Sequence, residues 1–134
     1  MFMLDTNICI FIIKKKYEQL LEHLKKNRKA GLFISSITLA ELEFGIENAA
    51  QEYNVRNRIA LMEFLSIMEI KHFDDNAAKE YGILKKDLKN KNCLIGPLDM
   101  LIRAHAKSLN MTLVTNNTNE FQRIKNLSII DWTK

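Results

Sequence analysis

The chain has 134 residues, of which 47% are hydrophobic, and its 20 Lys and Arg against 16 Asp and Glu give a net charge of +4. This length supports one domain with a hydrophobic core and is too short for two, and the apolar content argues against disorder. The small basic excess is compatible with a polyanionic partner but does not require one. Since no hydrophobic run is long enough to span a bilayer, no membrane association is expected.

The apolar start of the chain lacks the features of an export signal. Asp5 and Asn7 interrupt it, and it carries neither a basic leading segment nor a small-residue cleavage site. The two cysteines, Cys9 and Cys93, are not spaced as a metal-binding pair and are expected to be buried or half-buried thiols. We therefore expect a cytoplasmic protein.

The first half of the chain predicts two strands and three helices. In order, these are a strand at 1–4, a helix at 7–28 with an interruption around 14–16, a strand at 32–34, and helices at 37–50 and 53–67. In the last of these helices, Val55, Ile59 and Met62 recur at helical spacing, which is typical of a face turned toward a core.

The second half continues the alternation of strands and helices. It predicts a strand at 68–73, a helix capped by Asp74 or Asp75 and running to about 88, a helix at 98–109, a strand at 111–114, a helical turn at 120–124 and a strand at 127–130. Alternating strands and helices favour a mostly parallel sheet with helices on its faces. The predicted fold is a single α/β domain over residues 1–134, with four or five strands.

Four acidic residues fall where this fold would gather them. Asp5 follows the first strand, Glu41 and Asp99 lie in the first turns of helices, and Glu120 follows the strand at 111–114. Ligands bind at the carboxyl edge of such a sheet. Carboxylates converging there repel one another unless a cation lies between them. The pattern therefore indicates an oxygen-ligated divalent metal and hydrolysis of phosphodiesters.

Each acid also has a structural interpretation. Asp5 can cap the helix that follows it, and Glu41 stands three residues after Thr38, the spacing of a capping box. Asp99 near a helix start is favoured by the helix dipole, and Glu120 can simply be solvated. Capping alone does not require all four acids at one edge of the sheet, so the joint pattern favours the metal site.

Other polar residues give weaker signals. The run 115–119 supplies short polar side chains that either hold waters and phosphate oxygens or form a turn. The three histidines, His23, His72 and His105, are not spaced as a ligand set and are interpreted as structural. Cys9 lies in an apolar stretch, which predicts a core position and not a nucleophile.

Taken together, four segments resemble the motifs of PIN-domain ribonucleases, specifically the VapC-type toxins of bacterial toxin–antitoxin pairs. They appear in the family's order and are residues 3–7 (MLDTN), 35–45 (SSITLAELEFG), 95–106 (IGPLDMLIRAHA) and 114–121 (VTNNTNEF). The resemblance covers essentially the whole chain. It implies the PIN fold and a magnesium-dependent endoribonuclease, with manganese as a substitute.

The resemblance also assigns roles to the acids. Asp5 and Asp99 match the family's main magnesium ligands, and Glu41 matches the acid that completes the metal shell or orients the attacking water. Many PIN domains carry an aspartate where this chain has Asn117. Either Glu120 reaches the metal region or Asn117 helps through water.

Asn7 and Thr115 are the remaining supporting residues that the resemblance suggests. The implied reaction leaves a 5′-phosphate and a 3′-hydroxyl, and the implied substrate is structured RNA, notably the anticodon loop of initiator transfer RNA, whose cleavage inhibits translation. Two alternatives remain open. One is a catalytically silent module that binds RNA or a partner, and the other is a nuclease of RNA maturation or of DNA.

Partners follow from the same resemblance. A VapB-type antitoxin is expected to lie across the acidic groove and offer an arginine to the carboxylates. Residues 8–13 and 44–46 either form its docking surface or belong to the core. A homodimer and a toxin–antitoxin hetero-oligomer are expected, with promoter DNA bound only through the antitoxin.

Overall fold

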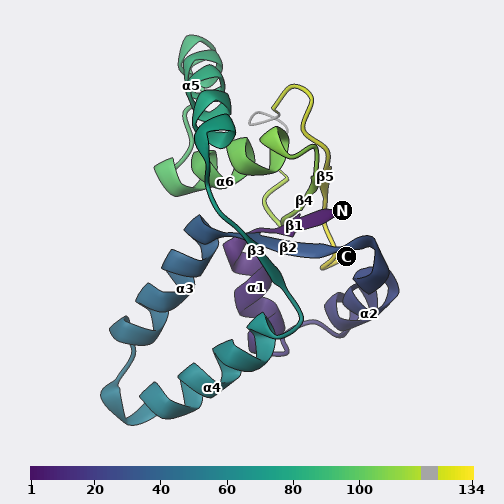
Figure 1. The fold of residues 1–134 in the computed structure, drawn as a ribbon, viewed down its shortest axis with the longest axis vertical. Coiled ribbons are helices and arrows are strands. Elements are labelled where there is room, and N and C mark those ends of the chain that lie inside the picture. Colours follow the sequence, from purple (N-terminus) through teal and green to yellow (C-terminus); the bar gives the residue numbers. More distant parts are fainter. Residues whose placement is uncertain (119–123) are drawn as a thin grey trace.

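The computed structural model describes residues 1–118 and 124–134. Its centre is a five-stranded sheet in the order β3-β2-β1-β4-β5, in which every neighbouring pair is parallel (Figure 1). The strands are β1 (Phe2–Leu4), β2 (Leu32–Ser35), β3 (Glu69–Lys71), β4 (Thr112–Val114) and β5 (Ile129–Ile130). The predicted α/β class and parallel sheet are confirmed.

Six α-helices connect these strands within the described ranges. They are α1 (Thr6–Ile13), α2 (Glu18–Asn27), α3 (Ser36–Asn48), α4 (Asn54–Leu65), α5 (Asp75–Asn90) and α6 (Pro97–Ser108). Two short 3-10 turns complete these connections. η1 (Arg28–Ala30) follows α2, and η2 (Gln51–Tyr53) precedes α4. None of the described helices combines the length and apolar character needed to cross a membrane.

The predicted interruption of the first helix is confirmed. Lys15 adopts a left-handed backbone conformation with φ of 53° between α1 and α2, which costs a residue other than glycine some strain and breaks the helical path. Asp74 caps α5, because its Oδ1 accepts a hydrogen bond of 3.0 Å from the backbone N–H of Ala77.

The two faces of the sheet pack against different helices, as Figure 1 shows with α5 and α6 on one side and α1 to α4 on the other. Because side chains alternate along a strand, Leu4 joins the core cluster formed with α1, α2 and α4, whereas Met3 joins the cluster under α6. Val114 and Leu113 of β4 divide in the same way. Burial on both faces explains why these short strands are continuously apolar.

The orientation of α4 corrects one expectation. Val55, Ile59 and Met62 share a helical face, but they are 74%, 52% and 63% exposed. The core instead takes Leu61 and Phe64, which are 2% and 4% exposed. Apolar residues lie on both sides of this helix, so helical spacing alone selected the wrong face.

The strand order positions the functional edge. The chain leaves β1 on one side to form β2 and β3 and later returns on the other side to form β4 and β5. The boundary between β1 and β4 is therefore the topological switch point, where the loops leaving the two strands diverge and a ligand crevice forms. The register pairs Leu4 of β1 with Val114 of β4. The next residue after each strand, Asp5 and Thr115, therefore lies at the crevice.

Candidate active site

Asp5 stands at the end of the central strand and is 4% exposed. It is the N-cap of α1, and its Oδ1 accepts a hydrogen bond of 2.8 Å from the backbone N–H of Thr6. Its Oδ2 accepts a bond of 2.8 Å from the hydroxyl of Thr115, which is itself fully buried. Capping and the predicted site position therefore coincide in one carboxylate, which two donors hold in a single orientation.

Glu41 is tied to the start of α1 and does not cap its own helix. The N-cap of α3 is Ser35, whose Oγ accepts a bond of 3.0 Å from the N–H of Ile37. Glu41 Oε1 instead accepts the hydroxyl proton of Thr6 at 2.7 Å. The capping-box interpretation of Thr38 and Glu41 is wrong, since this side chain turns toward the residue next to Asp5.

Asp99 lies in the first turn of α6 and faces the same region. Burial raises the pKa of its carboxyl above the ordinary value, the negative charge of Asp5 raises it further, and the positive charge of Arg103 partly offsets both. The Oδ2 atom of Asp99 would lie 3.7 Å from a Cβ at Gly96, so the turn before α6 closes over the carboxylate. The charge of Asp5 thus acts on the Asp99 carboxyl, which places the two acids in one region.

The pKa of the Cys9 thiol is also affected by the negative charges of this site. Burial raises its pKa well above the ordinary value, and the charges of Asp5 and, to a smaller extent, Glu41 raise it further. Cys9 is buried and Cys93 is half-buried, and both are free thiols, as predicted. Since a thiol is nucleophilic only as its thiolate, these pKa effects exclude Cys9 as a nucleophile near neutral pH.

The predicted supporting residues separate into two groups. Thr115 lies in the site, whereas Asn7 is exposed on the first turn of α1. Asn117 contributes through its backbone, because its N–H donates to Thr115 Oγ1 at 3.1 Å and its carbonyl accepts from Arg103 Nη2 at 3.1 Å. Glu120 and most of the predicted turn at 120–124 lie outside the described residues.

Three residues of this region were not anticipated from the sequence. The Thr6 hydroxyl donates to Glu41. Thr38 is buried, and its hydroxyl lies 3.2 Å from that of Thr6. Arg103 is 1% exposed and follows Asp99 by one helical turn. In the sequence, Arg103 differs from its neighbours because it is the one Lys, Arg, Asp or Glu in the mostly apolar or small stretch 100–106.

The described part of the chain contains no group of three or more His, Cys, Asp or Glu side chains placed as a preformed metal cage. Mg²⁺ does not need one, because it retains several waters and is commonly held by one or two carboxylates together with substrate phosphate. Asp5 and Asp99 fit this mode of binding. Burial and the charge of Asp5 both disfavour the ionised form of Asp99, and a bound cation would offset both.

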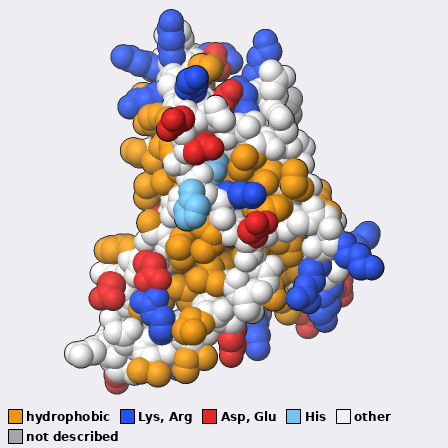
Figure 2. All heavy atoms as spheres, viewed as in Figure 1, with side chains coloured by type: hydrophobic (Ala, Val, Ile, Leu, Met, Phe, Trp, Pro, Cys, Tyr) orange, Lys and Arg blue, Asp and Glu red, His pale blue; other side chains and the backbone are white. Residues whose placement is uncertain are grey.

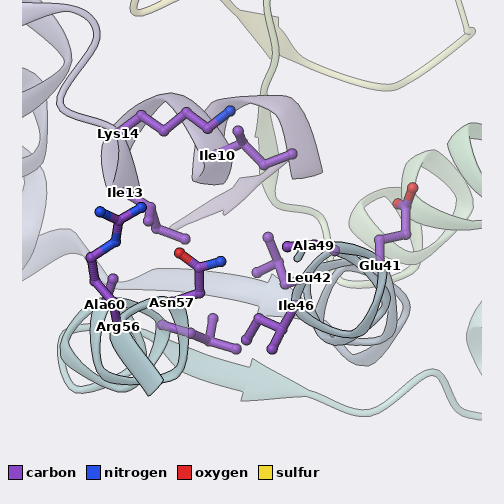
Figure 3. Close-up of a pocket in the computed structure, with 12 residues that line it drawn as sticks. Ile10, Ile13, Lys14, Glu41, Leu42, Ile46, Ala49, Arg56, Asn57 and Ala60 are labelled. Carbon is purple, nitrogen blue, oxygen red and sulfur yellow. The ribbon is translucent and has the colours of Figure 1, made fainter. Parts of the chain in front are cut away.

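An apolar groove of about 530 Å³ extends from Glu41 between α1, α3 and α4. Its lining includes Ile10, Leu42 and Ile46, and Figure 3 shows Glu41 at one end with Lys14 and Arg56 toward the other. The groove therefore presents an acidic end, an apolar middle and a basic end. Such polarity suits an extended or helical segment that carries opposite charges at its two ends.

Comparison with known proteins places this geometry in a family. The model of the PIN domain matches residues 2–127. The curated protein "Ribonuclease VapC2" of Rickettsia felis is 42% identical over 136 residues, covering 99% of this chain and 98% of its own length. The "tRNA(fMet)-specific endonuclease VapC" of Salmonella typhimurium is 41% identical over 131 residues, covering 98% and 97%.

Solved structures agree with these relatives. The VapBC2 complex of Rickettsia felis, bound to a DNA fragment from its promoter, contains a chain that superposes with a TM-score of 0.91 at 39% identity and 98% coverage of both chains. The agreement extends over the whole sheet and its helices, so the carboxyl edge described above is part of the shared fold.

Proposed function

The chain belongs to the PIN domain family, in its VapC branch of toxin–antitoxin ribonucleases, and on that premise we propose that it is a Mg²⁺-dependent endoribonuclease toxin. The observation that carries the proposal is the arrangement at the switch point, where two donors hold Asp5 rigidly and the charge of Asp5 acts on Asp99. A rigidly held carboxylate pair is what a cation-dependent hydrolase requires.

In this proposal, Asp5 and Asp99 hold the cation, and Mn²⁺ can substitute for Mg²⁺. The bound cation supplies positive charge to the scissile phosphate and makes water more acidic. Thr115 and the N–H of Thr6 keep both oxygens of Asp5 in place. Glu41, itself held by Thr6, completes the shell or orients the attacking water. Attack of water on phosphorus then breaks the bond to O3′, which leaves a 5′-phosphate and a 3′-hydroxyl.

We propose transfer RNA as the substrate, because the Salmonella relative is named a tRNA(fMet)-specific endonuclease. The anticodon loop of initiator transfer RNA, which the family resemblance implies, is the first target to test. Figure 2 shows Lys and Arg side chains gathered at the far end of α5 and over α2, which supports binding of a polyanion. Cleavage of the initiator would inhibit translation.

The decisive experiment incubates the purified protein with an initiator anticodon stem-loop RNA and the DNA oligonucleotide of the same sequence, with Mg²⁺ or with EDTA. We expect cleavage of the RNA alone, only with Mg²⁺, and its loss in Asp99→Asn. RNA binding without cleavage at any Mg²⁺ concentration would support the catalytically silent module. Cleavage of the DNA would support the alternative nuclease.

We further propose that the apolar groove receives a VapB-type antitoxin, because the related solved structures from Rickettsia felis and Salmonella typhimurium are VapBC complexes. The basic end at Lys14 and Arg56 would take an acidic residue of the antitoxin, and Glu41 would take its arginine. The antitoxin, and not this chain, would then contact promoter DNA. Residues 8–13 serve both purposes, because Ile8 and Ile12 are buried in the core while Ile10 and Ile13 line the groove.

Two helical glycines offer a matched test of this surface. A Cβ at Gly45 or at Gly82 meets no atom within 4 Å, and only Gly45 lines the groove. We expect Gly45→Phe to remain ribonucleolytic and toxic when the antitoxin from the adjacent reading frame is co-expressed, whereas Gly82→Phe is neutralised normally. Equal neutralisation of both variants would exclude the groove.

A homodimer is also proposed, and the exposed side of α4 is its candidate contact. Val55, Ile59 and Met62 form a continuous apolar stripe that the core does not cover. Light scattering of the purified chain should give twice the mass of one chain, and Ile59→Glu should halve it. A dimer that persists in Ile59→Glu would place the contact elsewhere.

A further inference from the structure

Arg103 is a buried cation whose contacts the proposed chemistry does not yet use. It lies on α6 and is 1% exposed, and its Nη2 donates to the carbonyl of Asn117 at 3.1 Å. Its Nε and Nη1 are also buried, and neither has a hydrogen-bond partner within residues 1–118 and 124–134. Burying a guanidinium is costly, so the contact with Asn117 is expected to have a function beyond packing.

From Asn117 a chain of hydrogen bonds leads to the catalytic carboxylate. The N–H of Asn117 donates to Thr115 Oγ1 at 3.1 Å, and that hydroxyl in turn donates to Asp5 Oδ2 at 2.8 Å. Each step joins one atom pair, and Thr115 is fully buried. The position of the Asn117 backbone, whose carbonyl is held by Arg103 and whose N–H contacts Thr115, therefore influences where the Thr115 hydroxyl lies and in which direction it points.

We propose that Arg103 is a positioning residue that holds the 115–117 turn and, through Thr115, orients Asp5. This inference rests on the proposed role of Asp5 as the ligand of the catalytic cation. Arg103 acts on the site from α6, so it joins the helix that carries Asp99 to the loop that orients Asp5. The two carboxylates are thereby fixed relative to each other, although they belong to the starts of α1 and α6, which lie on opposite faces of the sheet (Figure 1).

Direct binding of substrate by Arg103 is the competing explanation, and burial argues against it. Each of its Nε and Nη1 atoms exposes less than 1 Å², so an RNA phosphate cannot reach them without displacing the turn. The two explanations predict different kinetics, because a residue that positions catalytic groups affects kcat, whereas a residue that binds the substrate uniformly affects KM.

The first test replaces Arg103 with methionine, which keeps much of the volume and removes every donor. We expect kcat for RNA cleavage to fall by about 10- to 100-fold, as for other residues that orient metal ligands, with KM changed by less than about twofold. The half-saturating Mg²⁺ concentration, measured by thermal shift without RNA, should rise. Arg103→Lys should recover part of kcat, because one donor can still reach the Asn117 carbonyl.

Lys107→Met is the matched control. Lys107 lies one turn further along α6, and its Nζ is 3.4 Å from Glu80 Oε2, away from the hydrogen bonds that end at Asp5. It removes the same charge from the same helix, so kcat and the Mg²⁺ response should stay at their wild-type values. A loss equal to that of Arg103→Met would assign the effect to helix charge and overturn the proposal.

A double-mutant cycle tests whether Arg103 acts through Thr115. Thr115→Val breaks the last link, so adding Arg103→Met to it should reduce kcat by less than Arg103→Met does alone. Amide exchange at Asn117 gives a readout independent of activity and should accelerate in Arg103→Met. If that variant does not fold, Arg103→Lys replaces it in the cycle and in the exchange measurement.

Three further results would contradict the inference: wild-type kcat in Arg103→Met, a loss confined to KM, or full additivity with Thr115→Val. Asp5→Asn separates this failure from that of the proposed function. If Asp5→Asn abolishes cleavage while Arg103→Met keeps wild-type kcat, only the role of Arg103 is wrong. If Asp5→Asn cleaves RNA normally, the proposed function itself is wrong.

Discussion

Thr115 donates its hydroxyl proton to Oδ2 of Asp5 at 2.8 Å, although the two residues are 110 positions apart in the chain. The bond crosses the switch point between β4 and β1, whose register makes the two residues neighbours. Through this hydrogen bond, the first third and the last third of the chain meet at the proposed cation site.

Removal of this bond should impair catalysis without unfolding the protein. Thr115→Val keeps the shape of the side chain and leaves Asp5 held by the N–H of Thr6 alone. We expect kcat for RNA cleavage to fall by about 10- to 100-fold, since residues that orient metal ligands have effects of this size. Thr115→Ser restores the donor and should retain most activity. Equal loss in both variants would show that the methyl group matters and not the hydrogen bond.

Asp99→Asn should inactivate the protein and stabilise its metal-free fold. The raised pKa of Asp99 means that the folded state disfavours its charged form, so the ionised carboxyl costs stability at neutral pH. As pH falls through that raised pKa toward the ordinary value, protonation of Asp99 should add to the wild-type free energy of unfolding, so the stability difference between Asp99→Asn and the wild type should shrink.

Thermal unfolding without metal at pH 7.5 measures the effect. We expect Asp99→Asn to melt a few degrees higher, since about 1 kcal/mol shifts Tm by roughly 2–8 °C in domains near this size. Added Mg²⁺ should raise the Tm of the wild-type protein and leave that of the variant unchanged. A lower Tm for the metal-free variant would mean that the Asp99 carboxylate stabilises the fold.

His105 should make the fold sensitive to mild acid. Burial lowers the pKa of this histidine, which the charge of Asp74 only partly counteracts, and its Nδ1 lies 2.8 Å from Ser35 Oγ. Below about pH 6.5, the ordinary histidine pKa, the unfolded chain gains a proton at His105 before the folded chain does. The free energy of unfolding should therefore fall as pH decreases from that value toward the lowered pKa of the folded state.

The comparison of wild type with His105→Gln isolates this effect, because the other titrating groups are common to both proteins. Unfolding in denaturant at pH 7.5 and at pH 5.5 should show a larger loss of stability for the wild type than for the variant. Parallel losses in the two proteins would assign the acid sensitivity to other groups.

Two glycines should respond in opposite ways to a methyl group. Gly82 lies within α5, where a Cβ meets nothing within 4 Å, so Gly82→Ala should raise the free energy of unfolding by about 0.5–1 kcal/mol. Gly31 has φ of 94°, and its Cβ would lie 2.7 Å from Cε2 of Phe33. Gly31→Ala should therefore destabilise the fold, and denaturant titration of both variants tests the pair.

The sequence predicted the fold and the carboxyl edge well because both depend on local patterns. Asp5 comes where a strand passes into a helix, and Asp99 follows the Gly96–Pro97 helix start, so each could be placed without knowledge of tertiary contacts. The partner of Glu41 could not be predicted in this way. Thr6 is the first residue of α1, and Thr38 lies in the first turn of α3. Only the packing of α1 against α3 shows that the Thr6 hydroxyl donates to Glu41.

The misassigned face of α4 and the unforeseen burial of Arg103 have a related cause. Val55 and Leu61 lie on different sides of the same helix, so apolar spacing identifies a helix without choosing its inner face. An arginine is normally placed at the surface, and the carbonyl of Asn117, which accepts a hydrogen bond from Arg103, becomes its neighbour only in the folded structure.

The central position of β1 affects how the protein becomes active during synthesis. The residues of β1 are synthesised before Thr112–Val114, so the middle of the sheet cannot close until that later segment is available. Such pairing between distant segments forms late. A fragment that ends before residue 112 lacks Thr115 and one wall of the crevice, so it lacks the proposed cation site.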